Sequence, residues 1–102
     1  MSSGPFSLYI LRCADGSLYT GITTDVDKRV AEHAAGSRGA KYLRGRGPLE
    51  LVLSEPVGDR ATALRLEYRV KQLPRARKLE LIEGGMRLDE LLPDQVLEAG
   101  GS

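Results

Sequence analysis

The sequence predicts a mixed α/β domain of the α+β type, with a small three-stranded antiparallel sheet flanked by helices in the order β-β-α-β-α-α. Two short runs of β-forming residues, 6–12 and 17–22, surround an Asp-Gly turn signal. A third run at 49–54 alternates as a strand does, and three helical stretches are separated by glycine or proline. The 102 residues suit one domain with a single modest core.

The hairpin that joins the first two strands can close in two ways, and these place its tyrosines differently. A two-residue loop of Asp15 and Gly16 would put Tyr9 and Tyr19 on opposite faces of the sheet. A three-residue loop over positions 14–16 shifts the pairing by one residue, so that Tyr9 faces Gly21 and the tyrosines share a face. We expect the second turn, because Gly16 suits its left-handed position.

The first helix is expected to carry an apolar stripe that docks on the sheet. Thr24 or Asp25 can cap its first turn, and Gly36 can end it. At about 100° per residue, Lys28 and Glu32 point away from the stripe. The stripe itself consists of Val26, Val30 and Ala34.

Two polar side chains project beside that stripe. Arg29 and His33, the only histidine, lie one helical turn apart. Burying an unpaired cation is costly, so these groups need a cleft, a partner or a bound anion. The alternative is an arginine that reaches water at the helix edge and a histidine satisfied within the core. Their joint position makes both candidate site residues.

The second helix, 60–73, repeats this pattern before Pro74 interrupts it. Glu67 lies at the margin of its apolar stripe, where it can pair with Lys71 as ordinary surface charge. It can also face an interior cation or a hard metal ion such as magnesium. A third helical stretch ends at Gly84 and Gly85. The stripe of the second helix consists of Ala63, Leu66, Val70 and Leu73.

Charge is unevenly distributed, although the formal net charge is only +1. Residues 28–47 hold six Lys or Arg and one acid, whereas residues 83–98 hold one Arg and five acids. The glycine-rich loop within the basic stretch can track a phosphate backbone and offers one stacking ring, or it can be a solvated loop. Its candidate nucleic-acid-binding residues are Arg38, Lys41, Tyr42, Arg44 and Arg46.

Several function classes lack support in the sequence. No apolar run approaches the roughly 20 residues that span a bilayer, and no basic residue precedes the first apolar run. The single cysteine, Cys13, forms neither an internal disulfide nor a zinc site by itself. There is no phosphate-binding loop signature and no nucleophile elbow. We therefore expect a cytoplasmic protein without a membrane partner.

The segment "SLYILRCADGSLYTG" resembles the paired motif of the GIY-YIG nuclease superfamily, with Tyr9 and Tyr19 in the tyrosine positions and Gly21 as the final glycine. The helix "DVDKRVAEHAAG" looks like the arginine-bearing helix of that family, and Glu67 falls at its metal-binding glutamate. The likeness is to small single-domain bacterial members. It covers residues 5–82 and leaves 83–102 as a helical turn and an acidic, flexible tail.

The sequence departs from the family pattern at four points. Ser7 and Leu8 stand in for the glycine and isoleucine of the first triplet, and Thr20 replaces the isoleucine of the second. Many members use an asparagine downstream of the glutamate, but this chain contains no asparagine. That role is vacant or is taken by one of three other residues. These are Gln72, Lys71 and Lys78.

The resemblance implies a metal-dependent endonuclease that hydrolyses phosphodiester bonds in DNA, is structure-selective or weakly selective, and works in DNA repair. The implied catalytic residues are Tyr9, Tyr19, Arg29, His33 and Glu67. Glu67 would bind one Mg²⁺ or Mn²⁺ ion. Lys28 and Lys71 would join the basic loop on the nucleic acid. Tyr9 is the expected general base, with a pKa lowered by nearby cations or a hydrogen-bonded relay, and His33 is the second candidate.

Two other function classes compete with catalysis. The chain could be a nucleic-acid-binding module with a decayed site that uses only the basic loop. It could also be a protein-interaction domain that docks a partner through its acidic C-terminal segment. The sequence leaves the oligomeric state and the choice between DNA and RNA open.

Overall fold

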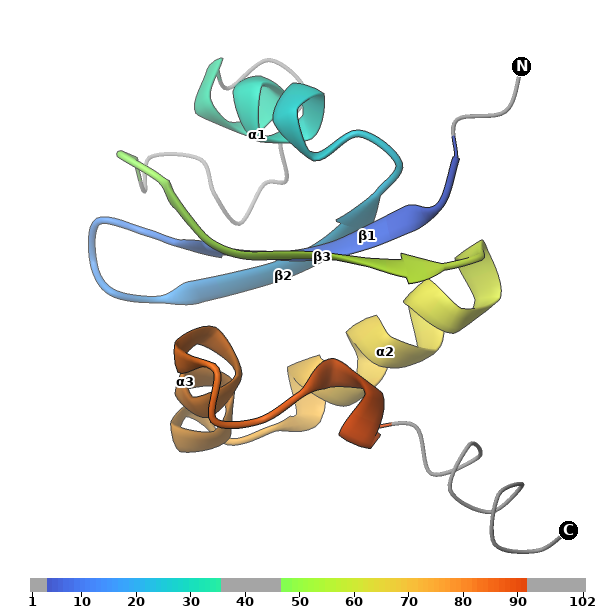
Figure 1. Ribbon diagram of the computed structural model, residues 1–102. Helices are drawn as coiled ribbons and strands as arrows, with labels where there is room; N and C mark the ends of the chain where they lie inside the picture. Colours follow the sequence, from blue (N-terminus) through green and yellow to red (C-terminus); the bar gives the residue numbers. More distant parts are fainter. Residues whose placement is uncertain (1–3, 36–46, 92–102) are drawn as a thin grey trace, which may run out of the picture.

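The protein is described by a computed structural model, which defines residues 4–35 and 47–91. The strands are β1 (Phe6–Arg12), β2 (Leu18–Thr23) and β3 (Glu50–Gly58). The helices are α1 (Val26–Ala35), α2 (Arg60–Gln72), α3 (Arg75–Glu83) and the 3-10 helix η2 (Leu88–Leu91). The predicted α+β class and element order are confirmed (Figure 1). No helix within the described ranges is long and apolar enough to cross a bilayer.

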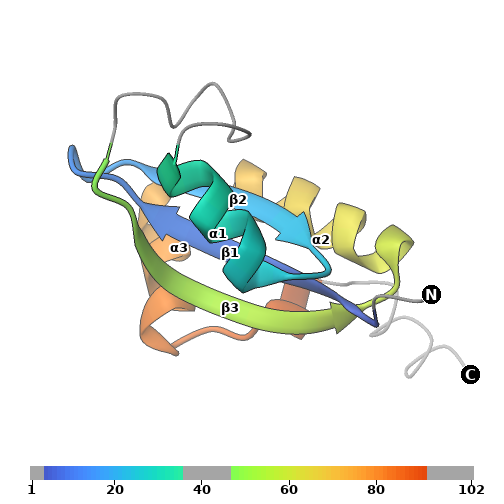
Figure 2. The ribbon, with the colours of Figure 1, turned by 90° about the horizontal axis from the view of Figure 1, so that it is seen from above.

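The sheet has the strand order β2-β1-β3, and all its pairs are antiparallel. Helix α1 covers one face, whereas α2, α3 and η2 cover the other (Figure 1). Seen from above, α2 extends along the β2 side of the sheet (Figure 2). The central strand therefore presents one of its faces to α1 and the other to the remaining helices.

Strand β3 is longer than the predicted 49–54 because it continues through Pro56 to Gly58. Pro56 lies opposite Ser7 of β1. The predicted strand ends at residue 54, before this proline, which has no N–H to donate to a ladder. β3 is an edge strand, however, and an edge position tolerates a missing N–H donor.

The hairpin closes with the predicted three-residue loop. Tyr9 pairs with Gly21, so both tyrosines lie on one face of the sheet. The Cys13 carbonyl accepts the Gly16 N–H at 2.9 Å, and the Cys13 N–H donates to the Ser17 carbonyl at 2.9 Å. Gly16 has φ +88°, the left-handed conformation that this turn requires. The turn geometry therefore sets the register that brings the tyrosines together.

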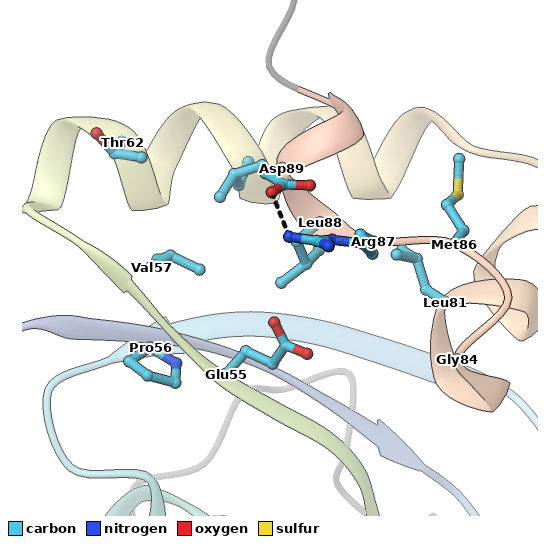
Figure 3. Close-up of a pocket in the computed structure, with 11 residues that line it drawn as sticks. Glu55, Pro56, Val57, Thr62, Leu81, Gly84, Met86, Arg87, Leu88 and Asp89 are labelled. Atoms are coloured by element: carbon cyan, nitrogen blue, oxygen red, sulfur yellow. Dashed lines mark hydrogen bonds and ion pairs between the residues drawn. The ribbon is translucent and has the colours of Figure 1, made fainter. Parts of the chain in front are cut away.

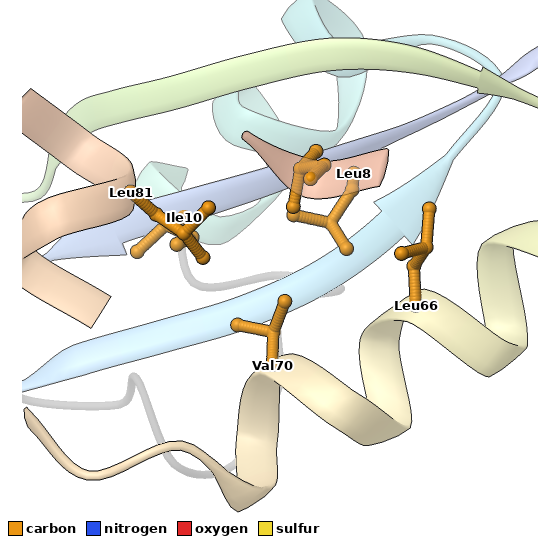
Figure 4. Packing of buried hydrophobic residues seen from close by; sticks show 6 residues of the cluster. Leu8, Ile10, Leu66, Val70 and Leu81 are labelled. Carbon is orange, nitrogen blue, oxygen red and sulfur yellow. The ribbon is translucent and has the colours of Figure 1, made fainter. Parts of the chain in front are cut away.

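The larger core lies on the face of the sheet that α2, α3 and η2 cover. Leu8 and Ile10 of β1 are fully buried against Leu66 and Val70 of α2 and Leu81 of α3 (Figure 4). The predicted stripe of α2 is confirmed, since its buried positions all belong to that stripe. The carboxylate of Asp59 caps α2, and Gly84 ends α3 with φ +88°. This core fixes the rotation of α2 about its axis.

The face of the sheet that α1 covers holds a smaller cluster, which includes Tyr9. Helix α1 docks on this cluster through Val26 and Val30. Ala34, predicted in the stripe, is exposed, and His33 occupies the buried position of the last turn instead. The helix is rotated in this way because His33 lies within hydrogen-bonding distance of the Tyr9 hydroxyl of β1. Asp25 caps the helix through its Oδ1, which accepts the Lys28 N–H at 3.1 Å.

A substitution in α2 tests the larger core. Leu66→Ala should lower the free energy of unfolding by about 2–5 kcal/mol, because it removes a side chain that is only 2% exposed. Leu64→Ala, on the outer face of the same helix, should change it by less than about 0.5 kcal/mol. Urea unfolding followed by circular dichroism measures both. An equal loss of unfolding free energy in the two variants would contradict this packing of α2.

Candidate active site

Three rings gather on the face of the sheet beneath α1. Tyr9 of β1 is 1% exposed, and its ring centroid lies 6.4 Å from that of Tyr19 of β2 and 6.0 Å from that of His33 of α1. The Tyr19 and His33 rings meet edge to face at 5.5 Å. The strand register and the rotation of α1 together produce this cluster.

The Tyr9 hydroxyl lies at the centre of the cluster. It is 2.9 Å from Nε2 of His33, within hydrogen-bonding distance. It also lies directly over Gly21, where a Cβ atom would be 2.6 Å from the hydroxyl oxygen. Only a glycine leaves room for the ring at this point. The packing thus explains the glycine of the second strand.

Arg29 approaches the same hydroxyl from α1. A hydrogen bond joins its guanidinium to Tyr9 and opposes the rise in the tyrosine's pKa. Its Nη1 also lies 3.0 Å from Oε1 of Glu32, and this contact raises the pKa of Arg29. Glu32 was expected to point away, but it folds back because the side chain three residues earlier is a cation. Arg29 is thus held between an acid and the Tyr9 hydroxyl.

A hollow of about 420 Å³ opens beside Arg29, between the end of β2 and the start of α1. It is lined by Thr23, Thr24, Asp25, Lys28, Arg29 and Glu32. Lys28, one of the predicted nucleic-acid-binding residues, is exposed at its rim. The hollow gives solvent a route to the guanidinium.

Glu67 reaches the site from α2, on the opposite side of the sheet. Its negative charge contributes to raising the pKa of Tyr9, which places the carboxylate within electrostatic range of the hydroxyl. Oε2 of Glu67 lies 3.3 Å from Nζ of Lys71. Lys71, another predicted nucleic-acid-binding residue, therefore already contacts a catalytic candidate. Of the three candidates for the missing asparagine's role, Lys71 has this contact.

Burial dominates the electrostatics of the site. It raises the pKa of Tyr9 to about 12, and the neighbouring Tyr19 and Glu67 add to the rise. The expected lowering by cations is therefore contradicted, because Arg29 offsets only part of the cost of desolvation. Burial and the charge of Arg29 lower the pKa of His33. The ring is therefore neutral at pH 7 and can accept a proton.

The raised pKa of Tyr9 predicts an alkaline loss of stability. The folded protein holds this proton more tightly than the unfolded chain, so the stabilisation is complete below pH 10 and disappears as pH rises through about 12. The loss should reach about 2–3 kcal/mol. Urea unfolding at pH 9 and pH 12 measures it against Tyr9→Phe, which cannot ionise and should lose less. Identical losses in the two proteins would contradict the burial of this hydroxyl.

The donor set at Glu67 suits one particular kind of metal binding. Across residues 4–35 and 47–91, no three His, Cys, Asp or Glu side chains form a cluster that could hold an ion. Mg²⁺ commonly keeps several waters and takes one or two carboxylates together with substrate phosphate oxygens. Glu67 is half-buried and its charge acts on the Tyr9 hydroxyl, which fits that mode. Lys71 must share or release the carboxylate when an ion binds.

The remaining predicted nucleic-acid-binding residues fall in segment 36–46. Arg38, Lys41, Tyr42, Arg44 and Arg46 lie outside the described residues, as does Gly36, the predicted end of the first helix. The acidic tail after residue 91 also lies outside them. Sequence reasoning placed Glu32 away from the site, although its position three residues after Arg29 was a signal for an ion pair.

A second pocket, of about 510 Å³, lies on the other side of the sheet (Figure 3). It is lined by the edge strand β3, by Leu66 and Leu81 of the larger core, and by an ion pair in which Arg87 Nη2 lies 2.9 Å from Asp89 Oδ2. None of the tyrosine cluster reaches it. The pocket is therefore separate from the cluster of Tyr9, Tyr19 and His33.

Comparison with known proteins places this arrangement in a family. The model of the GIY-YIG catalytic domain matches residues 5–80. The UPF0213 protein YhbQ of Escherichia coli (strain K12) is 57% identical over 88 residues, which cover 86% of this chain and 87% of that protein. The UPF0213 protein in the potE 3′ region of Serratia liquefaciens is 54% identical over 94% of both chains.

A solved structure agrees with these matches. The solution NMR structure of the UPF0213 protein BH0048 from Bacillus halodurans is 51% identical, with a TM-score of 0.51 over 76% of this chain and 82% of that one. The family match extends from β1 into α3 and so includes every residue of the tyrosine cluster. The chain therefore belongs to the GIY-YIG family, a family of nucleases.

Proposed function

We propose that the protein is a divalent-metal-dependent endonuclease that hydrolyses phosphodiester bonds in DNA, with structure-selective or weak selectivity. One observation carries the proposal. Helix α1 brings His33 and Arg29 to a single hydroxyl, that of Tyr9 on β1, and the charge of Glu67 acts on the same hydroxyl from α2. Phosphodiester hydrolysis needs a proton acceptor, a cation fork and an acidic metal ligand, and these four residues supply them.

Arg29 neutralises charge on the reacting phosphate. Its planar guanidinium offers several N–H donors in a fixed geometry, so it can bind a phosphate while it keeps a hydrogen bond to Tyr9. The hollow beside it admits an anion from solvent. Glu32 balances the guanidinium before substrate arrives and holds it in position.

Tyr9 and His33 accept the proton of the attacking water. As the water oxygen forms its bond to phosphorus, its proton passes to the Tyr9 oxygen, and the Tyr9 proton passes to Nε2 of His33. This relay needs a neutral His33 in the Nδ1–H tautomer, and the lowered pKa supports the neutral ring. Bound phosphate offsets the charge of Arg29, one of the two causes of that lowering. Tyr19 packs against both rings and orients them.

Glu67 holds the metal ion in this proposal. A bound Mg²⁺ or Mn²⁺ supplies Lewis-acid polarisation of the phosphate and charge relief at the leaving oxygen. The charge of this carboxylate acts on the Tyr9 hydroxyl. Helix α2, which carries it, extends along the β2 side of the sheet (Figure 2). Lys71 neutralises this carboxylate in the absence of an ion. When an ion binds to Glu67, Lys71 is released and contacts the nucleic-acid backbone.

A cleavage panel tests the proposal. Branched, flapped, single-stranded and duplex DNA are incubated with Mg²⁺, with Mn²⁺ or with EDTA, beside Glu67→Ala and Arg29→Ala. The wild-type protein should cut at least one substrate in metal only, and both variants should cut none. RNA versions of the same substrates show whether the protein cleaves DNA or RNA.

Binding without catalysis is the second candidate function. The observation that favours it is that Glu67 and Arg29 are already paired, with Lys71 and Glu32, in a chain that contains no asparagine. This function predicts that the wild-type protein binds these substrates and cuts none. Binding should then be unchanged in Glu67→Ala.

A further inference from the structure

The outer face of α2 carries an aromatic side chain that the proposed reaction does not use. Tyr68 is 66% exposed, and Leu64, one turn earlier, is 39% exposed. Side chains at i and i+4 of a helix lie side by side, so these two form one apolar surface. Within residues 4–35 and 47–91, only one other large hydrophobic residue, Leu51 of β3, is comparably exposed.

This surface is continuous with the candidate active site. At about 100° per residue, the surface of α2 passes from Glu67 through Lys71 and Leu64 to Tyr68 within roughly a quarter of a turn. Exposure increases in the same direction, from 20% for the Glu67 side chain to 50% for that of Lys71. A strand whose phosphate contacts a metal ion at Glu67 therefore passes Tyr68 as it leaves the site.

The charge around Tyr68 matches a polyanion. Helix α2 carries four basic residues and one acid, Glu67. Lys71 precedes Tyr68 on the surface path from Glu67, and Arg69 follows it in sequence. Glu90 of η2 lies across a neighbouring hollow, but Lys71 and Arg69 beside the ring are cations. Proteins bind single-stranded nucleic acids in this way, with bases stacked on a ring and phosphates on nearby cations. The same charges disfavour a basic protein surface as the occupant.

A hollow beside the ring leaves room for a base. It measures about 370 Å³ and lies between α2 and η2. Its lining residues are Tyr68, Arg69, Gln72, Leu73, Glu90 and Leu91. Arg69 and Gln72 offer hydrogen-bond donors at its edge, and the leucines offer an apolar floor.

We infer that Tyr68 is a stacking platform for an unpaired base of the nucleic-acid substrate, close to the phosphate that would contact the metal ion at Glu67. The inference rests on the proposed function and specifies its substrate class, which is a strand with unpaired bases next to the cleavage site. In a duplex, neighbouring bases cover both faces of each base, so the ring has nothing to stack on. Tyr68 therefore discriminates single strands, flaps and junctions from duplex.

Binding in EDTA tests this inference without cleavage. The probes are a single-stranded DNA with 2-aminopurine at successive positions and its fully paired duplex. Tyr68→Ala should raise the Kd for the single strand about tenfold, which corresponds to about 1.4 kcal/mol, and should abolish the quenching of 2-aminopurine at one position. The duplex Kd should change less than twofold. Tyr68→Phe keeps the ring and should bind as the wild type does.

Leu51→Ala is the matched control, since it removes an exposed apolar side chain of β3, leaves α2 unchanged and should change neither Kd. An unchanged single-strand Kd in Tyr68→Ala would overturn the inference, as would equal losses on both probes. So would a loss of self-association in Tyr68→Ala without a change in DNA binding, because a second protein chain would then be the occupant.

The outcome is separable from that of the proposed function. If the wild-type protein cuts no substrate while Tyr68→Ala still loses single-strand binding, the nuclease proposal fails and the stacking platform stands. If the wild-type protein cuts DNA while Tyr68→Ala binds single strands normally, the platform fails and the nuclease stands.

Discussion

A Gly21→Ala variant is expected to lose DNA cleavage by about 100-fold while it remains folded. The new Cβ would lie 2.6 Å from the Tyr9 hydroxyl oxygen and 2.7 Å from the carbon that bears it. The ring is buried and hydrogen-bonded to His33, so relief requires the hydroxyl to leave its partners. A displacement of about 1 Å in a reacting group costs rate on this scale. Single-turnover cleavage measures the loss.

Overpacking should also lower the free energy of unfolding of Gly21→Ala by about 1–3 kcal/mol. Gly85→Ala is the control, because the nearest neighbour of its new Cβ would be 3.8 Å away. The control should keep wild-type cleavage. If Gly21→Ala cleaves as fast as the wild type, the position of the Tyr9 hydroxyl does not matter for the reaction.

An Arg29→Lys variant is expected to lose at least about 100-fold in the cleavage rate although it keeps the positive charge. An ammonium cannot bond Tyr9, Glu32 and a phosphate in one plane, as the guanidinium can. The loss of one fixed donor at a reacting oxyanion costs about 10²–10³ in rate. The effect should fall on kcat more than on KM. Arg29→Ala should be slower still.

Arg77→Lys is the matched control for Arg29→Lys. Arg77 pairs with Glu80 at 3.4 Å with the same three-residue spacing, but on the exposed surface of α3. It should cleave at the wild-type rate. Equal rates in Arg29→Lys and Arg77→Lys would show that the fork of donors has no role at the phosphate.

Local rules sufficed for the hairpin and for the core face of α2. The choice of turn followed from the conformational freedom of Gly16, and that choice alone fixed the shared face of the tyrosines. The apolar spacing of α2 predicted its buried positions, and it placed Glu67 at their margin, where the side chain is half-buried. These features depend on residues that are near one another in sequence, so the local sequence was enough to predict them.

Three features of the candidate site and its surroundings depend on tertiary contacts, so they could not be predicted from the local sequence. His33 replaces Ala34 at the docking surface because its partner, Tyr9, is supplied by a distant strand. The pKa of Tyr9 rises because burial outweighs Arg29, and this balance depends on packing rather than on the list of neighbouring charges. The exposure of Tyr68 follows from the rotation of α2, so its surface role was visible only in the folded chain.

The central claim is metal-dependent cleavage that uses Tyr9, Arg29 and Glu67, and one comparison tests it most directly. Single-turnover rates are measured for the wild type and for Glu67→Gln in Mg²⁺, with Glu80→Gln on the exposed face of α3 as the control. Glutamine keeps the shape of the side chain and removes its charge. We predict cleavage by the wild type and by Glu80→Gln that EDTA abolishes, and none by Glu67→Gln. Cleavage by Glu67→Gln at the wild-type rate would contradict the account.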